Sequence, residues 1–173
     1  MKSKIALIAL LITGASLLPA QAMGSGNKYL DLQTGVTYRV MQPTNTLKLP
    51  LLNFEVRPCR LHPGKDEYLL AGYGGMDRGI ALVETSADFN CTGIDKPQSL
   101  GTIKINGITA KVGIYCAVAK CSAKQFPQMG GEITFTVPAN KLLRATYIRL
   151  GTQGGFTLAQ LTAFAQGLKS FGN

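Results

Sequence analysis

Four segments with a two-residue alternation lie in the last third of the chain, and they constrain the fold more than any other feature. Each alternates apolar residues with Thr, Lys, Arg, Glu or Tyr; they span 102–105, 109–115, 132–137 and 147–150. Such alternation predicts antiparallel strands with one buried and one polar face. Asn106-Gly107 between the first two segments predicts a tight hairpin.

A helix is predicted directly after these strands. Thr157 precedes Gln160 by three positions, which is the spacing of a capping box. The residues at helical spacing form one apolar stripe: Leu158, Leu161, Phe164, Ala165 and Leu168. We expect the helix to end near Gly172. The prediction is an α+β domain: an antiparallel sheet of about six to eight strands, with this C-terminal helix packed on one face.

The same stretch, about residues 101–168, resembles the ending of many bacterial extracytoplasmic domains. Those domains, which include anti-sigma-factor ectodomains and secreted proteins of unknown function, end in V-N-G, a hairpin, a Y-x-L-x-G strand and an L-S-x-E-E-L-x-x-I-A-x-S-L helix. The matching residues are Asn106, Gly107, Tyr147, Gly151, Thr157, Leu161, Ala165 and Leu168. Gln160 and Gly167 stand where that pattern more often has an acid and a Ser. The resemblance implies a fold and an exported location, and no active site.

The first 22 residues have the organisation of a secretory signal peptide. Lys2 and Lys4 precede an apolar core over 5–18, and Ala20-Gln21-Ala22 fits a cleavage site. We expect residues 1–22 to be removed, 23–35 to be a flexible N-terminal segment, and 36–173 to form a single domain. No later apolar run is long enough to cross a bilayer. The expected location is secreted or periplasmic.

Four cysteines remain after the predicted cleavage: Cys59, Cys91, Cys116 and Cys121. An even number in an exported chain predicts two disulfides, for which three pairings exist. The short spacing favours Cys116–Cys121, which leaves Cys59–Cys91. The spacing is not the C-x-x-C of redox enzymes, and His62 is the only histidine. We therefore predict two structural disulfides and no metal site.

The positive charge of the chain, +9 in total, is concentrated in its second half. Residues 23–95 have a net charge of −1, whereas residues 96–173 carry nine Lys or Arg against Glu132 alone. The alternation places Lys104, Lys111 and Arg149 on the polar face of the sheet, with Tyr115 and Tyr147. These five residues are the predicted binding site for an anionic polymer or surface: nucleic acid, an acidic glycan or lipid headgroups. The competing interpretation is a basic face that only keeps the protein soluble.

Catalytic motifs for a serine hydrolase, a zinc protease or a phosphate-binding loop are absent from the sequence. We therefore predict a non-enzymatic binding protein of the bacterial envelope, without a cofactor. One alternative is a secreted inhibitor or protein-interaction module that docks on another envelope protein through loops 58–66 or 117–131. A further alternative is an enzyme built from the acidic first half.

Overall fold

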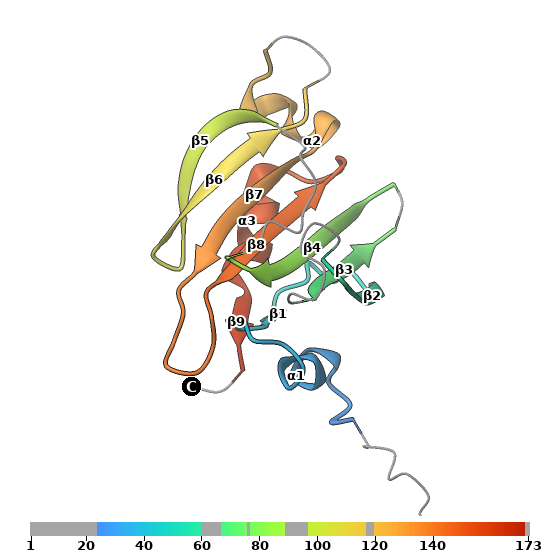
Figure 1. Ribbon diagram of the computed structural model, residues 1–173. Coiled ribbons are helices and arrows are strands. Elements are labelled where there is room, and N and C mark those ends of the chain that lie inside the picture. The colour runs from blue at the N-terminus through green and yellow to red at the C-terminus, as the bar shows by residue number, and fades with distance from the viewer. Residues whose placement is uncertain (1–23, 60–66, 76, 89–96, 117–119, 172–173) are drawn as a thin grey trace, which may run out of the picture.

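The computed structural model describes residues 24–59, 67–75, 77–88, 97–116 and 120–171. Its centre is a seven-stranded antiparallel sheet with strand order β2-β3-β4-β8-β7-β6-β5 (Figure 1). The strands are β2 (Leu51–Arg57), β3 (Tyr68–Gly74), β4 (Gly79–Ser86), β5 (Gln98–Ile105), β6 (Ile108–Ile114), β7 (Gly131–Val137) and β8 (Thr146–Thr152). Together with the helix near the C-terminus, this sheet confirms the predicted α+β class.

The predicted hairpin between β5 and β6 is confirmed. Ile105 pairs with Ile108, and Asn106 and Gly107 form the turn with φ angles of 48° and 84°. Both angles are left-handed, which is the requirement of a type I′ turn and explains the Asn-Gly sequence.

One side of the sheet, the core face, carries the apolar residues of the alternating strands. Helix α3 (Leu158–Gln166) covers this face and lies behind β7 and β8 in Figure 1. Leu161, Phe164 and Ala165 of this helix point toward the sheet and are fully buried. The Phe164 ring meets the Tyr73 ring of β3 edge to face, with 5.2 Å between centroids. The predicted stripe therefore does pack on the sheet.

The capping box of α3 is present, but the helix ends earlier than predicted. The Gln160 amide donates to Thr157 Oγ1 at 3.2 Å, and the Thr157 amide donates to Gln160 Oε1 at 2.9 Å. The helix stops at Gln166 with Gly167 as its C-cap, not near Gly172.

The early end of α3 follows from the chain that crosses beside Gly167. The Thr44 amide donates to the Gly167 carbonyl at 2.8 Å, and a Cβ at Gly167 would lie 2.8 Å from the Cβ of Asn45. The chain then continues as β9 (Leu168–Ser170), which pairs antiparallel with β1 (Met41–Pro43). A long-range pairing has replaced the last helical turn that the local pattern predicts.

Helix α1 (Lys28–Gln33) lies within the segment predicted to be flexible, 23–35. Asn27 caps it by accepting from the amides of Tyr29 and Leu30. Tyr29 is 3% exposed, and its hydroxyl is hydrogen-bonded to the hydroxyl of Tyr73. The Gly- and Ser-rich start of the segment hides this helix from sequence analysis, because the helix depends on burying Tyr29 against the sheet.

Glu84 of β4 is a fully buried carboxyl group on the core face. Its Oε2 accepts from the Met41 amide at 2.9 Å, which ties the start of β1 to the sheet. Its Oε1 has no hydrogen-bond partner among the described residues. Burial raises the pKa of Glu84 well above its ordinary value. A carboxyl group at this position is therefore neutral over a wider pH range than an exposed one.

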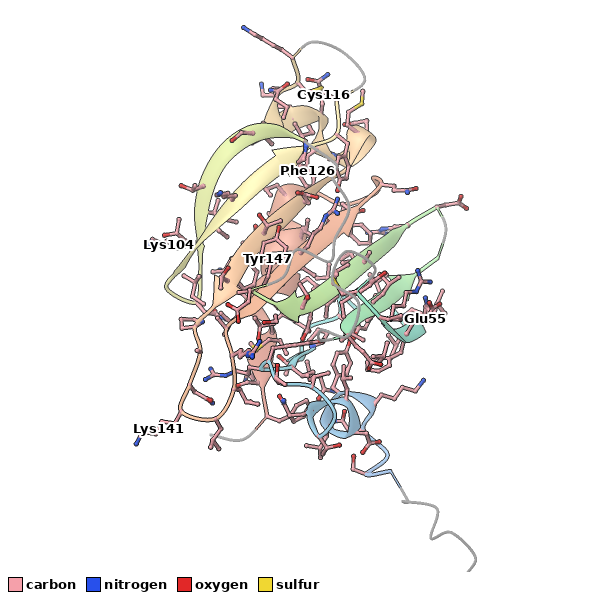
Figure 2. All side chains as sticks on the ribbon, viewed as in Figure 1. Glu55, Lys104, Cys116, Phe126, Lys141 and Tyr147 are labelled. Atoms are coloured by element: carbon pink, nitrogen blue, oxygen red, sulfur yellow. A yellow bond between two sulfur atoms is a disulfide. The ribbon has the colours of Figure 1, made fainter. Side chains whose placement is uncertain are left out.

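The connection between β6 and β7 contains the short helices η1 (Ala123–Gln125) and α2 (Phe126–Met129). Phe126 is fully buried, and Gly131 makes room for it: a Cβ there would lie 2.6 Å from the Phe126 ring. This connection closes the core at the end of the sheet opposite α1 (Figure 2, where Phe126 is labelled).

Candidate functional site

The other side of the sheet, the outer face, has a strip of very small residues at its centre. Gly72, Ala81 and Gly151 lie directly opposite one another on β3, β4 and β8. Asn53 of β2 and Glu132 of β7 continue the same row at its two ends. Because three adjacent strands carry nothing larger than a methyl group here, the outer face is hollowed over them.

A pocket of about 1110 Å³ lies over this strip, and we call it the outer pocket. Its floor includes Gly72, Ala81 and Gly151. Its walls come from the ends of the neighbouring strands and their loops: Leu52, Asn53, Asp77, Val83, Pro97, Gln98, Tyr115, Cys116, Arg149 and Gln153. The wall residues come from separate segments of the sequence, so only the folded sheet brings them together.

Pro97 forms part of the wall because Gly113 lets it approach the sheet. A Cβ at Gly113 would lie 2.4 Å from Pro97 Cγ. Any other residue on β6 at this point would push Pro97 outward and open the pocket on that side.

Tyr115, Glu132 and Arg149 form a hydrogen-bonded cluster at the edge of the outer pocket. The Tyr115 hydroxyl donates to Glu132 Oε2 at 2.7 Å, and Arg149 Nε donates to the same oxygen at 2.6 Å. Arg149 Nη2 donates to the Tyr115 hydroxyl oxygen at 3.0 Å. The side chains of Arg149 and Glu132 are only 15% and 11% exposed. This ion pair is therefore mostly shielded from water, and it fixes the wall at Tyr115 and Arg149.

The cluster keeps Tyr115 and Arg149 in their ordinary protonation states at neutral pH. Burial, with the hydrogen bond to Glu132, raises the pKa of Tyr115 to about 12. Burial lowers the pKa of Arg149, but the hydrogen bond that Arg149 donates to Tyr115 and the charge of Glu132 outweigh it and raise that pKa overall. Tyr115 is thus a neutral phenol and Arg149 a cation.

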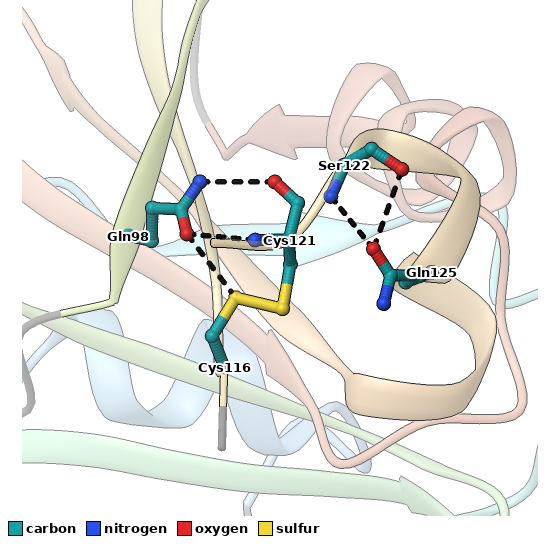
Figure 3. The surroundings of a disulfide bond; sticks show 5 residues. All are labelled: Gln98, Cys116, Cys121, Ser122 and Gln125. Carbon is teal, nitrogen blue, oxygen red and sulfur yellow. Dashed lines mark hydrogen bonds between the residues drawn. A yellow bond between two sulfur atoms is a disulfide. The ribbon is translucent and has the colours of Figure 1, made fainter. Parts of the chain in front are cut away.

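The predicted disulfide Cys116–Cys121 is present, and Cys116 lines one end of the outer pocket. Gln98 braces this loop (Figure 3): its Nε2 donates to the Cys121 carbonyl at 2.9 Å, and its Oε1 accepts from the Cys121 amide at 2.9 Å. Cys59 is also disulfide-bonded. The predicted partner of Cys59 is Cys91, which lies outside the described residues.

The five residues of the predicted basic site all lie on the outer face, but they do not form one cationic cluster. Arg149 is paired with Glu132, and Tyr115 touches both. Lys111 is exposed and lies in register with Thr134, which is opposite Arg149. Lys104 is exposed on the edge strand β5, where its Nζ donates to Thr109 at 2.7 Å. Tyr147, half-buried, lies at the centre of the sheet (Figure 2), and burial raises its pKa.

Sequence analysis placed Arg149 and Tyr115 on the right face but missed their internal partner, Glu132. It also missed the floor of the outer pocket. The alternation of residues 132–137 already places Glu132 on the polar face, and continuing the alternation past Leu150 places Gly151 there too. Neither position shows by itself that Glu132 pairs with Arg149. The row of Gly72, Ala81 and Gly151 depends on strand order and register, which no local pattern reveals.

The loops of the docking hypothesis are only partly described. In 58–66, residues 60–66 lie outside the described part of the chain, as does His62. In 117–131, residues 117–119 lie outside it, and the remainder forms the end of the disulfide loop, η1 and α2. Docking through either loop stays a prediction.

Comparison of the chain with protein-family models, with curated proteins and with solved structures gave no match. The resemblance to bacterial extracytoplasmic domains therefore stays a prediction. Within the described ranges, we find no cluster of three or more His, Cys, Asp or Glu that could hold a metal ion. Among the helices of those same ranges, none combines the length and the apolar character needed to span a membrane.

Proposed function

We propose that this chain is a non-enzymatic, exported binding protein of the bacterial envelope that holds its ligand in the outer pocket. The observation that carries the proposal is a pocket of about 1110 Å³ over a floor of glycine and alanine, with one wall fixed by the Tyr115–Glu132–Arg149 cluster. Ligand pockets typically measure roughly 300–1,000 Å³. The outer pocket therefore suits a ligand of several rings or residues.

The chemistry of the cluster favours binding over catalysis. A general acid or base works best when its pKa lies near the operating pH. Tyr115, with a pKa of about 12, and Arg149, whose pKa is raised further, are both far from that condition. Both side chains are also fixed by hydrogen bonds to Glu132. Fixed, unreactive polar groups beside an open floor are suited to recognising a ligand.

A thermal-shift screen with a variant that fills the pocket tests this proposal. Gly151→Leu places a large side chain on the floor, where the Cβ alone would already lie 3.7 Å from the Tyr115 hydroxyl oxygen. A ligand of the pocket should raise the melting temperature of the wild type, because it binds only the folded state. The same ligand should leave Gly151→Leu unchanged.

Lys111→Ser is the matched control for this screen, because Lys111 is exposed on the outer face but does not line the pocket. It should respond to the ligand as the wild type does. Ala81→Leu, on the neighbouring strand, is a second filling variant if Gly151→Leu does not fold. Ligands that stabilise the wild type and the filled variants equally would contradict the proposal.

Binding of an anionic polymer on the outer face is the second candidate function. It is favoured by the exposure of Lys104 and Lys111 on the same face as Arg149. Affinity for heparin or DNA should then fall linearly with salt on a log–log plot, and Lys104→Ser with Lys111→Ser should reduce the slope by about one per lost contact. Elution of the protein at low salt from both a heparin column and a DNA column would rule out this second function.

A further inference from the structure

The charge of the outer pocket differs from that of the whole chain. The chain has a net charge of +9, but the cation of the pocket, Arg149, is held 2.6 Å from Glu132. The other charged side chain on the described lining is Asp77, which is exposed at the rim. An anion entering the pocket would have to compete with Glu132 for a mostly buried guanidinium group, and separating such a pair is costly. The pocket is therefore unsuited to an anionic ligand.

Several polar side chains of the lining can accept hydrogen bonds from a ligand, and the amide groups of Asn53 and Gln153 can both accept and donate. The Tyr115 hydroxyl donates its hydrogen bond to Glu132 and accepts one hydrogen bond from Arg149, so its oxygen can still accept another. Gln98 uses its amide oxygen and one of its two amide hydrogens to bind the backbone of Cys121. Asp77, as a carboxylate, can only accept. A ligand that satisfies these groups must bring hydrogen-bond donors.

The floor favours a flat ligand. Adjacent strands lie roughly 4.8 Å apart, so the strip of Gly72, Ala81 and Gly151 is on the order of 10 Å wide. Residues without a large side chain let a ligand approach the backbone closely. The rings of Pro97 and Tyr115 stand at one side of this strip. A ring with an apolar face could lie flat on the floor, with its polar edge toward the walls.

We propose, building on the function proposed above, that the outer pocket binds an uncharged carbohydrate. The C–H face of a sugar ring lies on Gly72, Ala81 and Gly151, and its hydroxyl groups donate to Tyr115 and Asp77. An uncharged sugar supplies many donors without a negative charge, so it leaves the Arg149–Glu132 pair intact. The volume of about 1110 Å³ accommodates several sugar units.

Isothermal titration calorimetry of the oxidised protein with neutral and charged probes tests this inference. The neutral probes are N-acetylchitohexaose, maltohexaose and cellohexaose; the charged ones are a heparin hexasaccharide and spermine. At least one neutral hexasaccharide should bind, and its affinity should hardly change with salt, because no counterions are released. Neither charged probe should compete with it.

Variants of the floor, the wall and the surface sharpen this test. Gly151→Leu should abolish binding of the neutral hexasaccharide. Asp77→Asn, which keeps the size of an exposed side chain, should weaken it several-fold, and Tyr115→Phe by about tenfold. Lys111→Ser, outside the pocket, should bind as the wild type does.

Two kinds of result would overturn the carbohydrate assignment: no binding of the three neutral hexasaccharides at millimolar concentration, or binding of spermine or the heparin hexasaccharide alone. If such a charged probe is lost in Gly151→Leu, the outer pocket remains the binding site and only the ligand class is wrong. If it binds Gly151→Leu as tightly as the wild type, the pocket itself is not the site and the proposed function fails too.

Discussion

The two faces of the seven-stranded sheet carry different kinds of residue on the same strands. On β4 and β8, Leu82 and Leu150 face the core and are fully buried. Ala81 and Gly151, on the same two strands, face outward and form part of the floor of the outer pocket. The core face is filled by α3 and the N-terminal segment. The outer face has no helix over it among the described elements, and its central residues are too small to fill the space. The same alternation thus builds a packed core on one side and a hollow on the other.

Each face also contains a buried acid, and the two acids are accommodated differently. Glu84 on the core face accepts a hydrogen bond from the Met41 amide, and burial raises its pKa. Glu132 on the outer face is bonded to the cation of Arg149 and the hydroxyl of Tyr115. The core face therefore tolerates a carboxyl group chiefly as the neutral acid. The outer face maintains a charged, oriented cluster beside a pocket.

Removing a large, fully buried ring from the core face should have the largest effect on stability. Phe164 is fully buried and packs against Tyr73. Phe164→Ala should lower the free energy of unfolding by about 3–5 kcal/mol, because it removes apolar area and leaves a cavity. Urea denaturation measures this change. Leu142→Ala, at a side chain that is 91% exposed, should stay within about 0.5 kcal/mol of the wild type.

Breaking the ion pair of the outer face should have the next largest effect. Glu132→Gln leaves the Arg149 guanidinium mostly buried without its counter-charge, at a cost of about 3 kcal/mol in urea denaturation. The double variant Glu132→Gln with Arg149→Met removes both charges and should recover part of this loss. Arg149→Met alone completes the double-mutant cycle, and a loss in the double variant equal to the sum of the two single losses would show that the pair is not coupled.

The buried acid of the core face should give the protein a particular pH dependence. The pKa of Glu84 is higher in the folded protein than its ordinary value of 4.5, so the unfolded chain loses this proton first as the pH rises. Above that value, and up to the folded-state pKa, the free energy of unfolding should fall by up to about 1.4 kcal/mol per pH unit. The slope is measured by urea denaturation at a series of pH values.

Glu84→Gln should remove this slope and make the protein more stable than the wild type at neutral pH, since the amide stays neutral and can still accept from Met41. Glu67→Gln, at an exposed side chain, should keep the wild-type slope. An unchanged slope in Glu84→Gln would contradict the assignment of a neutral buried acid.

The smallest of these effects concerns the cap of the helix that covers the core face. Thr157→Ala removes the side chain that accepts from the Gln160 amide, and should cost about 1 kcal/mol in thermal or urea unfolding. Thr162→Ala, in the middle of the same helix, should be neutral or slightly stabilising, because Ala is the better helix former. Similar losses for both variants would show that the cap is not the cause.

The core face could be predicted from the sequence in far more detail than the outer face. The alternation, the Asn106-Gly107 turn and the Thr157–Gln160 box are local signals, and each corresponds to a feature of the fold. The core-face elements that were missed depend on long-range contacts: β9 on its pairing with β1, and α1 on the burial of Tyr29.

The candidate site was predicted only in part, for the same physical reason. Charge and periodicity identified Arg149 and Tyr115 as outward-facing residues. They could not show that Glu132 from another strand neutralises Arg149, nor that Gly72, Ala81 and Gly151 lie in one row. Both facts depend on strand pairing, which sets Glu132 of β7 near Arg149 of β8 and places Ala81 opposite Gly151, a residue seventy positions away in the sequence.

The central claim, that the outer pocket is the binding site, is tested most directly by amide chemical-shift mapping of the ¹⁵N-labelled protein. N-acetylchitohexaose, maltohexaose and cellohexaose are added in turn. The account predicts that the largest shifts fall on Gly72, Ala81 and Gly151, with Lys104 and Lys111 nearly unchanged. Shifts centred on Lys104 and Lys111 instead, with the floor unaffected, would contradict the account. The basic residues would then be the favoured binding site.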